Sequence, residues 1–383
     1  MDVSSVKNWV SWSAVWFPAC FAPQCLVCNT PDDHPRPSYM PNQPGPEDPS
    51  AAAGTAPMAN HHYDEANEHI CYQMAVKLGL NVALSPIDNA KLLMQIGFEP
   101  LPPTPTKTLF GRPVLGLPNV FKYMNYMRKR DGFWGLYRGS TSRIVCQLVS
   151  GCTFHQVTSR ITFKEEDRLR RKREEDLTED ELRKLFMMAT LRDLGGRLTC
   201  IILTHPLTVV KIRCIAQFIG QETQHSGILS SMRSIYQENG ILGFFAGLVP
   251  RLLGDLLSAL LVASLTYVVN NYVVEDKELK TYTGSTMASY CCVFQYIGSA
   301  LTYPFHVVST CSAVSNSGLV AGSPPYMPHY SSWVDCWRDL SAGNQLKRGG
   351  SIFFRYYTGP QVVLGGRVVP VGNYPGSGVA PLQ

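Results

Sequence analysis

Charge is scarce in this sequence. Asp, Glu, Lys and Arg together make up 16% of the 383 residues, against roughly 25% in average soluble chains. From Thr281 to Val334 none of these four residue types occurs. The net charge is +5, and no basic block stands apart from acidic neighbours. These features exclude nucleic acid as an expected partner, and the long uncharged stretches favour a membrane protein.

Patterns that bind metals or perform chemistry are also missing. Cys25 and Cys28 form a CxxC pair without a second pair at zinc spacing. Most other cysteines lie in apolar segments, where cysteine behaves as a small hydrophobe. There is no phosphate-binding loop, no nucleophile elbow and no carboxylate pair whose spacing argues for acid–base chemistry. We therefore predict no metal, no cofactor and no enzymatic activity.

One pattern occurs three times. Each copy begins with a proline in an apolar stretch and ends in a glycine followed by an aromatic residue. The first copy carries Pro-x-Asp-x-x-Lys and the ending Asp-Gly-x4-Tyr-Arg-Gly, in which the glycines are seven residues apart. Its residues are Pro86, Asp88, Lys91, Asp131, Gly132, Tyr137, Arg138 and Gly139. The second copy has Pro206, Thr208, Lys211, Gly240, Phe245 and Gly247, and the third has Pro304, His306, Ser309, Gly349, Phe354, Arg355 and Tyr356.

These repeats resemble the mitochondrial carrier family. The passages "FEPLPPTPTKTLFGRPV", "THPLTVVKIRCIAQFIGQE", "GILGFFAGLVPRLLGD" and "SPPYMPHYSSWVDCW" are similar to its divergent outer-membrane members, the mitochondrial carrier homologs. The resemblance covers residues 66–355 and implies an all-α membrane protein, a three-repeat helical bundle. It also implies a multi-pass location in the mitochondrial outer membrane.

Apolar segments at 70–97, 141–163, 187–218, 248–274 and 282–314 are long enough to span a bilayer, which takes about 20 residues. A carrier has six spans. The tail after Arg355 is rich in glycine and proline and contains no apolar run of that length. We therefore predict five transmembrane helices with the sixth missing, and an open seam beside the first and fifth. The predicted domains are an N-terminal extension (1–62), repeat 1 (63–163), a charged linker (164–184), repeat 2 (185–274), repeat 3 without its second span (275–356) and a Gly/Pro-rich tail (357–383).

In carriers, as the resemblance implies, the proline kinks each odd-numbered helix, and the acid of one repeat pairs with the base of the next to close a gate. Here Asp88 retains Lys211 as a candidate partner. Lys91 has lost its acid, because His306 stands in that position of repeat 3. We predict that a three-member gate cannot close as a ring.

The resemblance implies an insertase that moves tail-anchored and other α-helical proteins into the outer membrane, and docking of a pro-apoptotic BH3-type protein. The expected partners are lipid and client transmembrane helices. A receptor or scaffold without insertion activity, and a divergent solute carrier, remain alternatives. The candidate residues of the groove are polar or charged side chains within the spans: Lys91, Gln147, His155, Arg213, Arg251, Asp255, Gln295 and His306.

Each of these residues also has a structural explanation. Arg251 and Asp255 are four residues apart and can pair with each other, and Lys91 can extend to the membrane interface. The two histidines can be satisfied interior groups, and the two glutamines can bond between helices. Lys91 and Asp255 are the strongest candidates, because a charge deep in a span needs a reason.

Overall fold

The structure is a computed structural model that describes residues 75–107, 111, 113–161, 163, 165, 168, 178–225, 227–269, 277–357, 361–364 and 367–370. Its long helices are α6 (Ser140–Arg160), α8 (Glu179–Ala216), α10 (Leu248–Val268) and α11 (Lys277–Val314). Its shorter helices are α4 (Ser85–Ile96), α5 (Val120–Gly135), α9 (Ile228–Asn239) and α12 (Trp333–Ala342). Two short 3-10 helices, Ile241–Phe245 and Val320–Gly322, and helical residues 75–83 before α4 are also present in the described chain.

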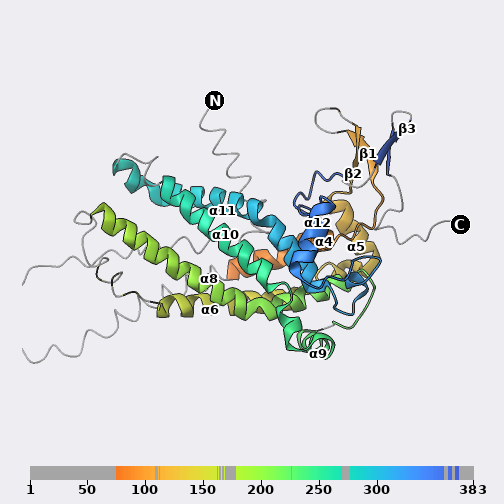
Figure 1. The fold of residues 1–383 in the computed structure, drawn as a ribbon, viewed down its shortest axis with the longest axis horizontal. Coiled ribbons are helices and arrows are strands. Elements are labelled where there is room, and N and C mark those ends of the chain that lie inside the picture. The colour runs from red at the N-terminus through yellow and green to blue at the C-terminus, as the bar shows by residue number, and fades with distance from the viewer. Residues whose placement is uncertain are drawn as a thin grey trace, which may run out of the picture.

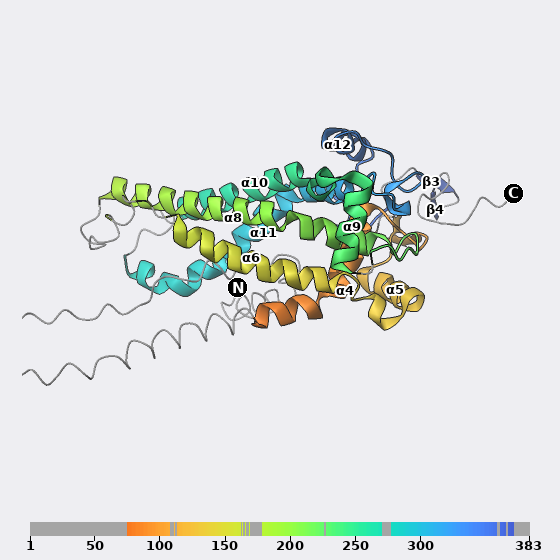
Figure 2. The same cartoon turned by 90° about the horizontal axis from the view of Figure 1, so that it is seen from below.

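The long helices run side by side along the molecule (Figures 1 and 2), with α6 packed along α8 and α10 packed along α11. The shorter helices α5, α9 and α12 gather at one end, which we call the short-helix end. In the chain, α5 lies between α4 and α6, α9 lies between α8 and α10, and α12 follows α11. In repeats 1 and 2 a short helix therefore separates two apolar helices.

Local sequence explains where the helices begin. Asn119 caps α5 by accepting a hydrogen bond from the amide of Lys122, and Ser332 caps α12 in the same way through Asp335. Pro86 lies in the first turn of α4, after a turn at Leu84 that separates this helix from helical residues 75–83. A proline is tolerated there because the first amides of a helix have no partner within the helix. The prolines of repeats 2 and 3 lie inside α8 and α11 instead.

The glycines of the repeats join each repeat to the next at the short-helix end. Gly139 and Gly247 have φ angles of 76° and 75°, which glycine adopts without strain. A Cβ atom at Gly139 would lie 3.5 Å from the carbonyl oxygen of Lys211, and one at Gly247 would lie 2.4 Å from that of Ser309. Repeat 3 reaches repeat 1 through Gly349, whose φ is 72° and whose Cβ would lie 3.3 Å from the carbonyl oxygen of Lys91. Three equivalent carbonyls thus each meet a left-handed glycine.

A second contact between repeats 1 and 3 is a buried ion pair. The guanidinium of Arg355 bonds the carboxylate of Glu99 and donates to the carbonyl of Pro118 at 3.1 Å. Burial raises the pKa of the Glu99 carboxyl, and the hydrogen bond from Arg355 opposes that rise. Backbone hydrogen bonds from the amide of Leu117 to Arg355 and from the amide of Tyr357 to Leu115 surround the pair. We call this contact the repeat 1–3 junction.

Apolar side chains are buried at the short-helix end and exposed along the long helices. Tyr123, Phe218 and Ile235, for example, are almost fully buried there. Leu191 and Leu203 of α8 are more than half exposed, as expected for side chains that face lipid. Two described segments, Arg183–Ala216 and Ile241–Val268, are long and apolar enough to cross a bilayer. The other three predicted spans form helices too, and their crossing of the bilayer stays a prediction.

The structure adds strands that the sequence analysis did not predict. β1 (Thr104–Lys107) pairs antiparallel with β2 (Pro113–Gly116) in the Pro-rich loop, and β3 (Gln361–Leu364) pairs with β4 (Arg367–Pro370) in the tail. The tail hairpin follows from β-branched residues on both sides of a Gly-Gly pair. The described residues after α12 contain no helix. The predicted extension 1–62 lies outside the described residues, as does most of the charged linker, and α8 already begins at Glu179 within that linker.

Candidate functional site

Three predicted residues meet between α10 and α11. The Nε atom of Arg251 lies 3.7 Å from one carboxylate oxygen of Asp255, and the Nε2 atom of His306 lies 3.8 Å from the other. Gly254 lets α10 approach α11 here, because a Cβ on it would lie 2.9 Å from the Cβ of Phe305. The side chains of Arg251, Asp255 and His306 are 24%, 17% and 32% exposed. This charged cluster is therefore paired and yet still partly accessible.

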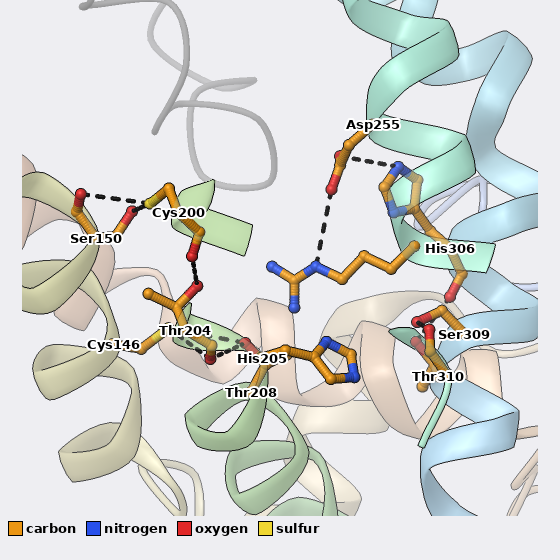
Figure 3. A network of polar contacts seen from close by, with 12 residues as sticks. Cys146, Ser150, Cys200, Thr204, His205, Thr208, Asp255, His306, Ser309 and Thr310 are labelled. Carbon is orange, nitrogen blue, oxygen red and sulfur yellow. Dashed lines mark hydrogen bonds and ion pairs between the residues drawn. The ribbon is translucent and has the colours of Figure 1, made fainter. Parts of the chain in front are cut away.

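Hydroxyl and thiol groups of α6 and α8 lie opposite the charged cluster. Figure 3 shows Asp255 and His306 on one side and Thr204, His205 and Thr208 on the other. The hydroxyl of Thr204 donates to the carbonyl of Cys200 at 2.8 Å, and the Ser150 hydroxyl lies 3.0 Å from the Cys200 thiol. The interior of the bundle is thus lined by polar groups from helices of two repeats. Sequence analysis missed these small side chains, because serine, threonine and cysteine also occur as ordinary helix-packing residues.

The other predicted residues are more dispersed. The ammonium group of Lys91 lies 5.5 Å from the centre of the Tyr303 ring, a cation–π distance. Gln147 accepts a hydrogen bond from Asn81, so it joins α6 to the helical residues before α4. Gln295 is buried on α11. His155 belongs to α6, but its side chain is outside the described part of the chain.

Asp88 bonds to a residue that the sequence analysis did not select. Its carboxylate accepts a hydrogen bond from the guanidinium of Arg143, which also donates to the side-chain oxygen of Asn89 at 2.9 Å. Asn89 in turn donates to the carbonyls of Leu136 and Arg138, both at 2.9 Å. Asp88 therefore has a hydrogen-bond partner within repeat 1, and it also interacts electrostatically with Lys211 of repeat 2, the partner to which the carrier pattern pointed. An arginine in the otherwise uncharged stretch after Gly139 was the signal that could have identified Arg143.

Arg213 lies outside the charged cluster. It is 1% exposed, and its guanidinium bonds the carbonyl of Ala313, the carboxylate of Glu238 and the side chain of Asn239. These contacts tie α8 to α9 and to the end of α11, which indicates a structural role. Arg213 also lines a cavity of about 430 Å³ at the short-helix end, beside Ser315 and Tyr330. Client binding by Arg213 stays a prediction.

The signature residues of repeat 1 stabilise the turn before α6. The carboxylate of Asp131 lies 2.8 Å from the guanidinium of Arg138 and accepts a hydrogen bond from Gln221 at 3.0 Å. Gly132, the residue after Asp131, has a φ of 76°, and Gly240 has a φ of 64° at the same place in repeat 2. Among the described residues no group of three His, Cys, Asp or Glu side chains could hold a metal ion. The charged cluster and the polar groups around it can offer hydrogen bonds and charge to a bound segment.

Comparisons with known proteins agree with this architecture. A profile described as "Mitochondrial carrier protein" matches residues 195–277. The human protein "Mitochondrial carrier homolog 2" is 40% identical over 295 residues, which cover 74% of this chain and 93% of that protein. The mouse protein "Mitochondrial carrier homolog 1" is 34% identical over 337 residues, 84% of each chain. The chain therefore belongs to the mitochondrial carrier homologs, within the mitochondrial carrier family of membrane proteins.

Proposed function

We propose that this chain is a protein insertase of the mitochondrial outer membrane. Its clients are tail-anchored and other α-helical membrane proteins, whose transmembrane helices pass through its polar interior into lipid. The observation that carries the proposal is the charged cluster of Arg251, Asp255 and His306, partly exposed among helices with apolar outer faces. No chemical step and no cofactor belong to the mechanism, because transfer of the client helix into lipid supplies the free energy.

The polar interior lowers the cost of the step that limits insertion. A client's polar flank must pass the hydrocarbon, where a charged side chain costs about 2.5–3.5 kcal/mol or more. The charged cluster and the hydroxyls of Thr204 and Thr208 on α8 replace part of the water that the flank loses. Because Asp255 is negative while Arg251 and Lys91 are positive, the interior offers partners to flanks of either sign.

A client helix must also leave the interior sideways. On the apolar faces of α11, Val293, Tyr296 and Leu301 are each more than half exposed, and Leu80 before α4 is 48% exposed. We propose that these apolar faces border the predicted seam beside the first and fifth spans. A client helix that lies in the seam contacts protein on one side and lipid on the other, so it can partition without crossing a sealed wall.

The pairing of Asp88 favours this function over solute transport. A carrier gate needs an acid of one repeat to bond a base of the next, and here Asp88 bonds Arg143 of its own repeat. Asp255 lies near Arg251 of its own repeat and near His306 of repeat 3, and His306 stands where the carrier pattern has an acid. Receptor or scaffold roles, including docking of a BH3-type protein, stay expectations from the resemblance.

The test is insertion of a radiolabelled tail-anchored protein into outer-membrane vesicles that lack this chain, contain it, or contain a variant. Two clients share one transmembrane helix and differ in a flank of lysines or of glutamates. Asp255→Arg should lower the ratio of basic-flank to acidic-flank insertion, and Lys91→Glu should raise it. Unit charges about 10 Å apart at an effective dielectric constant of about 20 interact by about 1.7 kcal/mol, and a charge reversal changes this interaction by about 3.3 kcal/mol, with opposite sign for the two flanks. Each change in the ratio should therefore be well above tenfold.

Matched controls reverse charges on exposed positions. Asp180→Arg and Lys122→Glu make the same chemical changes where the side chains face solvent, and both should leave the ratio unchanged. Insertion that is equal with and without the chain would refute the insertase and leave a receptor or scaffold. Insertion that depends on the chain, with a ratio that no variant alters, would refute the role of the charged cluster.

A further inference from the structure

Four cations gather where the polar interior meets the short-helix end. Two of them are Lys91 and Lys211, each five residues after the proline of its repeat, and Ser309 holds that position in repeat 3. The backbone carbonyl of each of these three residues meets a left-handed glycine of the neighbouring repeat. The three residues therefore lie at one level of the bundle.

The other two cations are arginines that lie one turn into the following helices. Arg143 on α6 and Arg251 on α10 each stand four residues after the left-handed glycine that precedes their helix. Both have a carboxylate nearby. Asp88 accepts a hydrogen bond from Arg143, and a carboxylate oxygen of Asp255 lies 3.7 Å from Arg251. Four cations thus share two carboxylates, so this part of the interior carries an excess of positive charge.

Lys211 is partly buried on α8, and in the described part of the chain no carboxylate lies within ion-pair distance of it. Its ammonium group interacts electrostatically with Asp88, whose carboxylate is bonded to Arg143. It also interacts with two like charges, those of Arg143 and Arg251. A charge that is held out of bulk water needs an opposite charge or hydrogen-bond acceptors nearby. The surroundings of Lys211 therefore favour an anion that comes from outside the chain.

We propose that these four cations bind the C-terminal carboxylate of a client, with the Lys211 ammonium as its principal contact; this inference rests on the proposed insertase function. The transmembrane helix of a tail-anchored protein lies at its C-terminus, so every such client must carry an α-carboxylate across the bilayer. That group is negatively charged at neutral pH, and it loses its hydration in hydrocarbon at a high cost. Charge-assisted hydrogen bonds from ammonium and guanidinium groups replace that hydration.

The place of the four cations suits the leading end of a client. Beyond them, the short-helix end is filled by buried side chains such as Tyr123, Phe218 and Ile235. A client tail that enters the interior from the opposite end therefore reaches the cations with its terminal group. The client helix behind it then lies along the long helices and beside the predicted seam, through which it passes into lipid.

The experiment compares two clients that differ only in the last chemical group. Peptide ligation supplies the same tail-anchored protein with a C-terminal carboxylate or a C-terminal carboxamide. Both are inserted into outer-membrane vesicles that lack the chain, contain it, or contain a variant. Lys211→Gln should lower the ratio of carboxylate to carboxamide insertion by more than about tenfold, because it removes a unit charge that acts even at about 10 Å and an effective dielectric constant of about 20.

Two further variants separate the charge of Lys211 from other effects. Lys211→Arg keeps the charge and should keep the ratio. Lys184→Gln makes the same chemical change as Lys211→Gln on an exposed position of the same helix, so it should leave the ratio unchanged.

A second measurement uses the unmodified chain and does not depend on how a variant folds. A water-soluble carbodiimide couples a carboxylate to an amine within contact distance. Added during insertion, it should join the client terminus to the amine of Lys211, and mass spectrometry of the digested sample should detect the joined peptides. The carboxamide client should not give this product.

The outcomes distinguish this inference from the function on which it rests. Equal insertion with and without the chain would overturn both proposals. Insertion that depends on the chain, with a ratio that Lys211→Gln does not change, would overturn the carboxylate site alone and leave lipid phosphate as the counter-anion of Lys211. Coupling of the client terminus only to lysines outside the interior would also overturn the carboxylate site.

Discussion

The repeat 1–3 junction should open when its ion pair is broken. Arg355→Met removes a guanidinium whose side chain is 5% exposed, and it leaves the carboxylate of Glu99, 15% exposed, without that partner. The same change removes the bond to the carbonyl of Pro118. Methionine fills a similar volume, so the loss is mainly electrostatic.

The magnitude follows from burial. Removal of one partner of a buried ion pair costs about 3–5 kcal/mol, because the remaining charge stays in a poor solvent. Three backbone amides report on the junction, since those of Leu117, Val120 and Tyr357 donate across it. At about 1.4 kcal/mol per factor of ten, local opening of the junction should speed their hydrogen exchange by about two to three and a half orders of magnitude.

Hydrogen-exchange mass spectrometry of the chain in lipid nanodiscs measures this effect. Peptides that cover residues 115–120 and 352–357 should exchange faster in Arg355→Met, while peptides from α9 should not change. The double variant Glu99→Leu with Arg355→Met should recover much of the protection, because an apolar pair leaves no buried charge.

Unchanged hydrogen exchange in Arg355→Met would refute the reasoning, since the ion pair would then not stabilise the junction. A double variant that exchanges as fast as Arg355→Met would refute it in another way. It would show that the geometry of the arginine fork and its bond to Pro118 stabilise the junction, and that relief of the charge on Glu99 does not.

Two further predictions concern stability in detergent. Gly247→Ala places a Cβ 2.4 Å from the carbonyl oxygen of Ser309 at a φ of 75°. It should cost about 1–3 kcal/mol of stability and lower the unfolding temperature. The control is Gly79→Ala, whose added Cβ meets no atom within 4 Å and should not lower the unfolding temperature. Burial, aided by Arg213, lowers the pKa of His225 to about 4. The unfolded chain, with a histidine pKa of about 6.5, therefore binds the proton first. Stability should fall as the pH drops from about 6.5 toward 4, and His225→Gln should flatten this dependence in thermal unfolding measured at several pH values.

Sequence alone predicted the elements that depend on local chemistry. The proline starts, the glycine ends and the apolar stretches located four long helices, and Gly132, Gly139, Gly240 and Gly247 all have the positive φ that such motifs need. The tail hairpin was missed, because a Gly/Pro-rich composition hid two short β-branched runs. The five spans stay a prediction, since two described segments are apolar enough to cross a bilayer by length and composition.

The candidate site depended on contacts that spacing does not encode. The pairing of Arg251 with Asp255 was visible, because residues four apart on a helix are neighbours. The hydrogen bond between Asp88 and Arg143 was not, since it depends on how α4 and α6 pack. The same holds for Arg213, whose charge suggested an interior role until its contacts with Ala313 and Glu238 were known.

The glycines of the three repeats keep their contacts between repeats, whereas the charges do not keep the carrier pattern, and this contrast bears on function. Each repeat still meets the next at a left-handed glycine: Gly139 at Lys211, Gly247 at Ser309 and Gly349 at Lys91. The short-helix end is therefore held together as in a complete ring. One turn away, Asp88 hydrogen-bonds Arg143 of its own repeat, and the carboxylate of Asp255 lies 3.7 Å from Arg251 and 3.8 Å from His306. Because the carrier motif has lost its acid in repeat 2 and both its acid and its base in repeat 3, it cannot supply the full ring of ion pairs of a carrier gate. In the function proposed above, the interior therefore serves as a fixed polar surface for a passing helix.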